Sequence, residues 1–318
     1  MKKTVLYKLL KNLFLFVSIV FVLDRAIGYT LKKMYFKGQK GDFYQTTYAI
    51  TNAKEQVLIL GSSRAAHHYV SSILQNNMQL STYNLGRDGR NIAYAYTVFS
   101  QLLTYHHPKI VILDMQPEEF VWNETRQSEE ATVSALLPYI NYPAIDQIIS
   151  RNNRTDIILS KIFWTYPYNS IALQIIGNRY NLLAGEETIQ GFIPLAGSKR
   201  SKGKAALDIN HPKRKPTDTA LVNTFKDFLA LARNKHVDLH VVISPTSVFS
   251  PYNSISQIKQ LTQQSGFRFY NYSTSVKDYS LFYDETHLNI KGATQFTTSL
   301  AKELQNNTED RFKLATVK

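Results

Sequence analysis

The chain of 318 residues contains no cysteine. Disulfides, thiolate metal sites and cysteine nucleophiles are therefore excluded, although this absence does not identify the cellular compartment. No glycine-rich phosphate loop of the Walker or dinucleotide-binding kind is present, and no internal repeat is visible. The histidines are scattered and have no matching carboxylate cluster, so we predict neither a metal site nor a cofactor.

Positive charge is confined to two segments, although the net charge is +13. Residues 1–40 hold nine basic side chains against one acidic, and residues 199–215 hold seven against one. The remaining residues, with 21 basic and 22 acidic side chains, are close to neutral. A broad basic face for a phosphate backbone is therefore not expected, and we predict no nucleic-acid partner.

One long apolar run stands near the N-terminus, Leu13–Leu23, broken only by Ser18, and the mainly apolar segment counted from Val5 covers residues 5–23. As a helix these 19 residues would span about 29 Å, close to the thickness of a bilayer core. The run suits a signal peptide or an uncleaved anchor, and a buried amphipathic helix is the less favoured third interpretation. Residues 26–28 resemble a cleavage site, but Asp24 and Arg25 precede them, so we favour an anchor. We predict that residues 1–40 are a signal anchor and juxtamembrane stalk, with the body outside the cytoplasm, periplasmic or at the cell surface.

From residue 55 onward, short apolar strand patterns alternate with helical patterns of about a dozen residues. The expected strands are 56–60, 82–85, 110–113, 239–243 and 267–270. The expected helices are 64–75, 92–105, 217–235, 254–264 and 290–304, with Thr217 as the cap of the third. This alternation predicts βαβ units and an α/β fold, an open parallel sheet flanked by helices.

Two segments interrupt the alternation. Residues 121–200 contain short apolar helical pieces separated by prolines, and we interpret them as a helical insertion. Residues 198–216 have loop composition and a dense run of basic side chains. We interpret this basic loop as a solvated segment, with capture of an acidic glycan or a lipid headgroup as the alternative. Apart from residues 1–40, we expect one domain over residues 41–318.

Polar residues follow the first, second and last expected strands. Gly61-Ser62-Ser63 follows the first strand, and the second is followed by a loop that contains Gly86. Asp284 and His287, three residues apart, follow the last strand. Carboxyl ends of parallel strands share one edge of a sheet, so we expect these groups to meet there. A carboxylate that fixes one nitrogen of an imidazole leaves the other free as a base for a serine hydroxyl. Ser63 as a helix cap is the alternative.

These blocks and their order resemble the SGNH, or GDSL-like, hydrolase family. The resemblance covers residues 55–120 and 217–305, and it implies a flavodoxin-like three-layer fold. It also implies that Ser63 is the nucleophile, that His287 is the base and that Asp284 orients the imidazole. The amides of Ser63 and Gly86 would then hold the oxyanion.

The chain departs from the family pattern in two places. Ser62 stands where the family's first block has aspartate, and no Gly-x-Asn-Asp block follows the third strand. Gln116 falls where the asparagine of that block would lie, and it is the candidate third oxyanion donor. Arg64 and Arg87 are candidate substrate contacts or surface charges. Two further histidines, at positions 67 and 68, are expected to be packing or surface residues.

The resemblance implies a membrane-anchored esterase or acyltransferase that acts on acyl esters. We expect the substrate to be an acylated glycan, with O-acetyl groups of a cell-envelope or extracellular polysaccharide favoured over other esters. The alternative is a protein that kept the fold but lost efficient chemistry and serves as a glycan-binding or scaffolding protein. The missing third block favours this alternative, whereas the set Ser63, Asp284 and His287 favours an enzyme.

Overall fold

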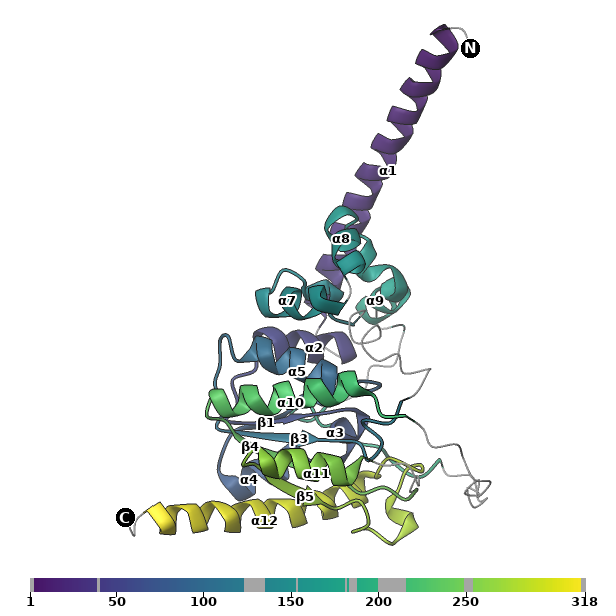
Figure 1. Ribbon diagram of the computed structural model, residues 1–318. Helices are drawn as coiled ribbons and strands as arrows, with labels where there is room; N and C mark the ends of the chain where they lie inside the picture. Colours follow the sequence, from purple (N-terminus) through teal and green to yellow (C-terminus); the bar gives the residue numbers. More distant parts are fainter. Residues whose placement is uncertain are drawn as a thin grey trace. The chain divides into compact units, whose positions relative to one another are not determined.

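The structure is a computed structural model that divides into two compact units (Figure 1). One unit comprises residues 1–44 and 133–185, and the other comprises residues 45–132 and 186–318. The residues described are 3–38, 41–122, 135–152, 154–180, 182, 188–199, 216–248 and 254–315. Most of the predicted basic loop, residues 200–215, lies outside them.

The second unit is built on a sheet of five strands that are all parallel, in the order β2-β1-β3-β4-β5. The strands are β1 (Val57–Leu60), β2 (Thr82–Asn84), β3 (Ile110–Asp114), β4 (Asp238–Ile243) and β5 (Arg268–Asn271). The central strands β1 and β3 are buried along their whole length, which explains their continuous apolar sequence. The predicted open parallel α/β sheet is confirmed.

Helices cover both faces of this sheet (Figure 1). The helices of this unit are α3 (Ser63–His68), α4 (Ser71–Met78), α5 (Ile92–Leu102), α10 (Thr219–Asn234), α11 (Ile255–Gln264) and α12 (Ile290–Ala315), with a 3-10 turn η4 (Tyr279–Leu281). On one face α5 packs against α10, with Phe99 and Phe228 stacked at 4.6 Å. On the other face α4 and α3 pack against α12, around a core that includes Tyr69 and Phe296.

The helix predicted over residues 64–75 is wrong, because the structure has two helices with a break at Tyr69. Tyr69 is extended, with φ −108° and ψ 107°, and its hydroxyl donates to Asp114 at 2.6 Å. At the break, the Thr297 hydroxyl of α12 donates to the His68 carbonyl at 2.9 Å and accepts the Val70 amide at 3.0 Å. These tertiary hydrogen bonds outweigh the local helical pattern.

The predicted cap of α10 also needs correction. Asp218, not Thr217, is the N-cap, and its carboxylate accepts the amides of Ala220 and Leu221 at 3.1 and 3.2 Å. A carboxylate serves two of the helix's first amides at once, which a threonine hydroxyl does less well.

The first unit combines the long N-terminal helix α1 (Lys3–Lys37) with the insertion, and α2 (Gly41–Thr51) crosses from this unit to the other. Within the predicted insertion, residues 121–200, the described helical elements lie between residues 137 and 179: η2 (Leu137–Tyr139), α7 (Pro143–Asn152), α8 (Arg154–Ile162), η3 (Tyr166–Ile171) and α9 (Ala172–Arg179). Asp24 of α1 accepts the Trp164 amide at 2.9 Å and the Thr165 hydroxyl at 2.6 Å. Gly28 allows this approach, since a Cβ there would lie 2.5 Å from the Trp164 backbone.

The helix α1 is long and apolar enough to cross a membrane. Its most apolar window has a mean hydropathy of 2.0 and is 0% buried. No other helix among the described residues meets the same length and composition. An N-terminal helix of this kind fits a signal anchor or a signal peptide.

Candidate active site

Ser63 lies where β1 ends and α3 begins, at the carboxyl edge of the sheet. Gly61 in this turn has φ +148°, and a Cβ there would lie 2.6 Å from the Asp114 carbonyl oxygen, so the turn requires glycine. Ser62 is the N-cap of α3, and its hydroxyl accepts the Arg64 amide at 3.4 Å. The capping is thus performed by Ser62, and Ser63 is the first helical residue.

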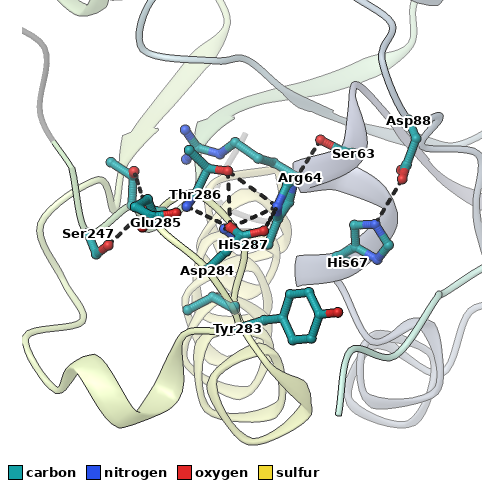
Figure 2. A network of polar contacts seen from close by, with 12 residues as sticks. Ser63, Arg64, His67, Asp88, Ser247, Tyr283, Asp284, Glu285, Thr286 and His287 are labelled. Carbon is teal, nitrogen blue, oxygen red and sulfur yellow. Dashed lines mark hydrogen bonds and ion pairs between the residues drawn. The ribbon is translucent and has the colours of Figure 1, made fainter. Parts of the chain in front are cut away.

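The Ser63 hydroxyl contacts His287, which in turn contacts the Asp284 carboxylate, and both residues belong to the loop before α12 (Figure 2). Ser63 Oγ lies 2.8 Å from His287 Nε2, and His287 Nδ1 lies 2.9 and 3.0 Å from the two Asp284 carboxylate oxygens. An ionised carboxylate only accepts, so Nδ1 donates to Asp284 and a neutral His287 ring accepts the Ser63 proton at Nε2. The side chains of His287 and Asp284 are 21% and 30% exposed, so the group is reached from solvent.

The loop that carries Asp284 and His287 is a closed bend. Phe282 and Leu288 pair across its base, and Asp284 Oδ1 accepts the amides of Thr286 and His287 at 2.9 and 2.8 Å. The three-residue spacing therefore lets one carboxylate both shape the loop and hold the imidazole. Burial acts to raise the pKa of Asp284, but hydrogen bonds from the His287 ring and these amides outweigh it and lower the pKa.

Beneath Ser63, α3 is joined to the residue that follows β4. The buried Arg64 guanidinium donates to Ser244 Oγ at 3.0 and 3.2 Å and to the Ser244 carbonyl oxygen. His68 accepts the Leu288 amide at Nε2, 3.0 Å away, so Nδ1 carries the proton and donates to Ser244 Oγ at 3.0 Å. Burial, and then the charge of Arg64, lowers the pKa of His68 well below its ordinary value and keeps the ring neutral.

A second histidine–carboxylate pair lies beside the first (Figure 2). His67 Nε2 is 3.2 Å from Asp88 Oδ2, and His67 Nδ1 is 2.9 Å from the Ile193 carbonyl oxygen. A histidine serves two acceptors only when both ring nitrogens carry protons. Burial acts to raise the pKa of Asp88, but the hydrogen bond and charge of His67, followed by the charge of His287, outweigh it and lower the pKa. Neither pair has a third ligand for a metal: among the described residues no such group of three is present.

The three predicted oxyanion donors have different surroundings. The Ser63 amide is the first of α3, where helix amides have no intrahelical acceptor. The Gly86 amide donates to Asn84 Oδ1 at 2.9 Å, and the Gln116 side-chain amide donates to the Arg90 carbonyl oxygen at 3.5 Å. The oxyanion roles of all three residues stay predictions, and the Gly86 amide would have to leave Asn84 to take part.

The two arginines proposed as substrate contacts are buried, at 4% exposure for Arg64 and 6% for Arg87. A substrate contact by Arg64 would require the guanidinium to leave Ser244. The Arg87 amide donates to the Gly61 carbonyl oxygen at 3.1 Å, which ties the loop after β2 to the turn before Ser63.

The polar roles of three residues in this region were not predicted from the sequence. His67 and His68, expected in packing or surface positions, are 3% and 0% exposed and belong to the polar network around the site. Asn84 is fully buried and donates to the Ala65 carbonyl oxygen at 2.7 Å, which holds α3 in place. The sequence did contain an indication that His67 lies beside Ser63, because residues four positions apart lie on the same face of a helix.

A family model described as "Protein of unknown function (DUF1574)" matches residues 5–218, which is well over half of the chain. The match includes α1, the insertion and Ser63, and it ends before Asp284 and His287. No curated protein matches the chain.

Three solved structures are similar to the chain at low identity. The first is an active-site mutant of a family two carbohydrate esterase from Clostridium thermocellum, in complex with celluohexase, at 9% identity and TM-score 0.40. The match covers 81% of this chain but only 65% of the esterase, less than two thirds of its length.

The second is a candidate acylhydrolase from Bacteroides fragilis, at 12% identity and TM-score 0.37, with 87% of this chain and 94% of that chain covered. The third is a candidate platelet activating factor from Streptococcus pneumoniae, at 12% identity and TM-score 0.35, with 91% and 99% covered.

Proposed function

We propose that this chain, which belongs to the family described as "Protein of unknown function (DUF1574)", is a serine-dependent esterase or acyltransferase of the SGNH type. The observation that carries the proposal is the continuous contact from Ser63 through His287 to Asp284, at 2.8 and 2.9 Å. A hydroxyl, an imidazole and a carboxylate in this order are the elements of nucleophilic acyl transfer. Their positions, after β1 and before α12, agree with the family resemblance in the sequence.

In the proposed reaction, Ser63 Oγ attacks the carbonyl carbon of an ester while its proton moves to His287 Nε2. Asp284 stabilises the imidazolium that forms, and the Ser63 amide donates to the developing oxyanion. The carbon–oxygen bond of the ester then breaks, and His287 returns the proton to the leaving alcohol. In the second half-reaction, water or a sugar hydroxyl attacks the acyl carbon while His287 Nε2 accepts its proton. The bond between the acyl carbon and Ser63 Oγ then breaks, and His287 returns the proton to Ser63 Oγ. Water gives an esterase, and a sugar hydroxyl gives a transferase.

We further propose that the substrate is an O-acetyl ester of a cell-envelope or extracellular polysaccharide, outside the cytoplasm. The location is supported by the architecture of the first unit: α1 carries an apolar run of bilayer length and continues beyond it as one helix to Lys37. Arg25, just beyond that run, donates to the Ile162 carbonyl oxygen at 2.9 Å, so the helix and the insertion are joined where the apolar run ends. This arrangement suits a retained membrane anchor, with the catalytic domain in the periplasm or at the cell surface.

The test is labelling of the full chain with a fluorophosphonate probe. We expect the wild type to be labelled and Ser63→Ala to be unlabelled. Ser62→Asn is the matched control, because asparagine is an equally good N-cap and Ser63 remains. Turnover of p-nitrophenyl acetate should be lost in His287→Ala. A folded wild type that is neither labelled nor active would contradict the proposed chemistry.

A second candidate function is binding or scaffolding without catalysis. The observation that favours it is the Gly86 amide, which is occupied by Asn84 and so is not directed at an oxyanion. The absence of the Gly-x-Asn-Asp block in the sequence points the same way. This candidate predicts binding of acetylated glycans by a chain that the probe does not label, and it fails if Ser63 is labelled.

A further inference from the structure

The first unit contains a cavity of about 500 Å³ between α1 and the insertion. Gly28, Tyr29 and Lys32 of α1 line one side, and α8 and the segment that follows it line another, including Ser160 and Trp164. All lining residues belong to this unit, and the cavity has the size of an ordinary small-molecule pocket. Figure 1 shows α8 and α9 beside the C-terminal half of α1.

The cavity lies just beyond the apolar run of α1. Gly28 follows Leu23 by five residues, about 7.5 Å along a helix, and the headgroup region extends about 5–7 Å beyond the bilayer core. The Trp164 amide is bonded to Asp24, so this tryptophan is fixed near the membrane boundary. Trp164 is 46% exposed, and tryptophan is enriched at membrane–water interfaces.

Exposed apolar side chains lie next to Trp164 in the sequence, on α8 and in the residue that follows it. Ile158 and Ile162 are 48% and 50% exposed and lie four residues apart on α8, so they share one face of that helix. Phe163, the next residue, is 45% exposed. Exposed apolar side chains beside a bilayer-length apolar helix fit the acyl chains of a lipid, which would cover them.

The polar lining is suited to a negatively charged group. The Lys32 side chain makes no hydrogen bond or ion pair within the described part of the chain. The Lys161 ammonium lies 3.5 Å from Asp146 Oδ1, with its side chain 60% exposed. Ser160 is only 6% exposed, and its hydroxyl has no hydrogen-bond partner among the described residues. The cavity thus combines two cations and an unpartnered buried hydroxyl with apolar walls.

We propose that this cavity binds a phosphate-bearing lipid, with the headgroup phosphate at Lys32 and Lys161 and the acyl chains along the exposed face of α8. The inference rests on retention of α1 as a membrane anchor, and it does not depend on the chemistry at Ser63. Bound lipid would fix the first unit at the membrane surface.

The sequence supplies a reporter, because Trp122 and Trp164 are its only tryptophans. The full chain with Trp122→Phe is reconstituted into phosphatidylcholine vesicles that contain increasing fractions of brominated phosphatidylglycerol or brominated phosphatidylcholine. We expect the anionic lipid to quench Trp164 fluorescence at a lower mole fraction. Lys32→Gln and Lys161→Gln should each reduce this preference about fivefold, the factor that corresponds to about 1 kcal/mol for a direct ion pair with one lipid phosphate.

Lys33→Gln is the matched control, because Lys33 is the exposed neighbour of Lys32 and does not line the cavity. It should leave most of the preference intact, and a loss equal to that of Lys32→Gln would overturn the site in favour of general surface charge. Equal quenching by the two lipids would also overturn it. Loss of the preference in millimolar inorganic phosphate would assign the cavity to a soluble phosphate instead. If carbonate extracts the chain from the vesicles, α1 is not a membrane anchor. Labelling of Ser63 by the fluorophosphonate probe does not depend on any of these results, so the proposed chemistry is tested separately.

Discussion

The imidazole rings of His67 and His287 lie edge to face, with their centroids 5.3 Å apart and their planes at 82°. His67 is held at both nitrogens, by Asp88 and by the Ile193 carbonyl oxygen. The His67 ring is therefore fixed in position and packs against the His287 ring. This packing limits rotation of the His287 side chain and favours the rotamer that faces Ser63.

Replacement of His67 by alanine removes this packing contact but leaves the side chains of Ser63, His287 and Asp284 unchanged. We expect kcat for p-nitrophenyl acetate to fall about 10- to 100-fold with little change in KM, because a small misplacement of a reacting group has costs of this order. His67→Phe keeps a ring at this position but loses the hydrogen bonds to Asp88 and Ile193, so it should recover kcat in part. Equal losses in the two variants, or a change in KM alone, would contradict a positioning role for the ring.

Arg64 and Asp114 are buried charged groups connected through Ser244, whose hydroxyl accepts from Arg64 and whose amide donates to Asp114 Oδ1 at 3.1 Å. Burial raises the pKa of Asp114, and the charge of Arg64 opposes that rise. Arg64→Met leaves the carboxylate without its cation, so we expect the free energy of unfolding to fall by about 3–5 kcal/mol. The double variant with Asp114→Asn should lose less than the sum of the two single changes, as measured by denaturant unfolding. Additive losses would show that the two charges are not coupled.

The sheet could be predicted from sequence because its signals are local. Apolar runs such as Val57–Leu60 and Ile110–Asp114 end at turn residues, and the helical patterns between them are long enough to cross from strand to strand. The break at Tyr69 could not be predicted, because it depends on Thr297, which is more than 200 residues away in the sequence. Local patterns do not contain such tertiary hydrogen bonds.

The same limit applies to the site. Ser63, Asp284 and His287 were proposed because they follow strands of one parallel sheet, and the structure brings them into contact. The surrounding network is long-range: the role of His68 depends on the Leu288 amide. The burial of Arg64 depends on Ser244, which follows β4, so its guanidinium points into the core rather than toward a substrate.

The pKa of Asp284 is below its ordinary value, which links this loop to stability in acid. A lowered pKa in the folded state gives stabilisation that is present above the unfolded pKa, about 3.9, and is lost as pH falls through the folded value. We therefore expect Tm of the wild type to fall more steeply below about pH 4 than Tm of Asp284→Asn. Glu285→Gln is the control in the same loop, and it should keep the wild-type slope. Parallel curves for the wild type and Asp284→Asn would show that the loop carboxylate has no net effect.

The helix α1 should remain attached in the mature protein. The Asp24 carboxylate, 10% exposed, accepts the Trp164 amide at 2.9 Å and the Thr165 amide and hydroxyl at 3.1 and 2.6 Å. Cleavage after residues 26–28 would remove this carboxylate and leave three donors unpaired, at about 1–3 kcal/mol each where they are buried. Intact-mass measurement of C-terminally tagged protein from membranes should therefore find residues 1–28 present, and Asp24→Ala should increase proteolysis in the first unit. Recovery of a stable chain without these residues, with unchanged Tm, would show that Asp24 is dispensable and that the segment is a signal peptide.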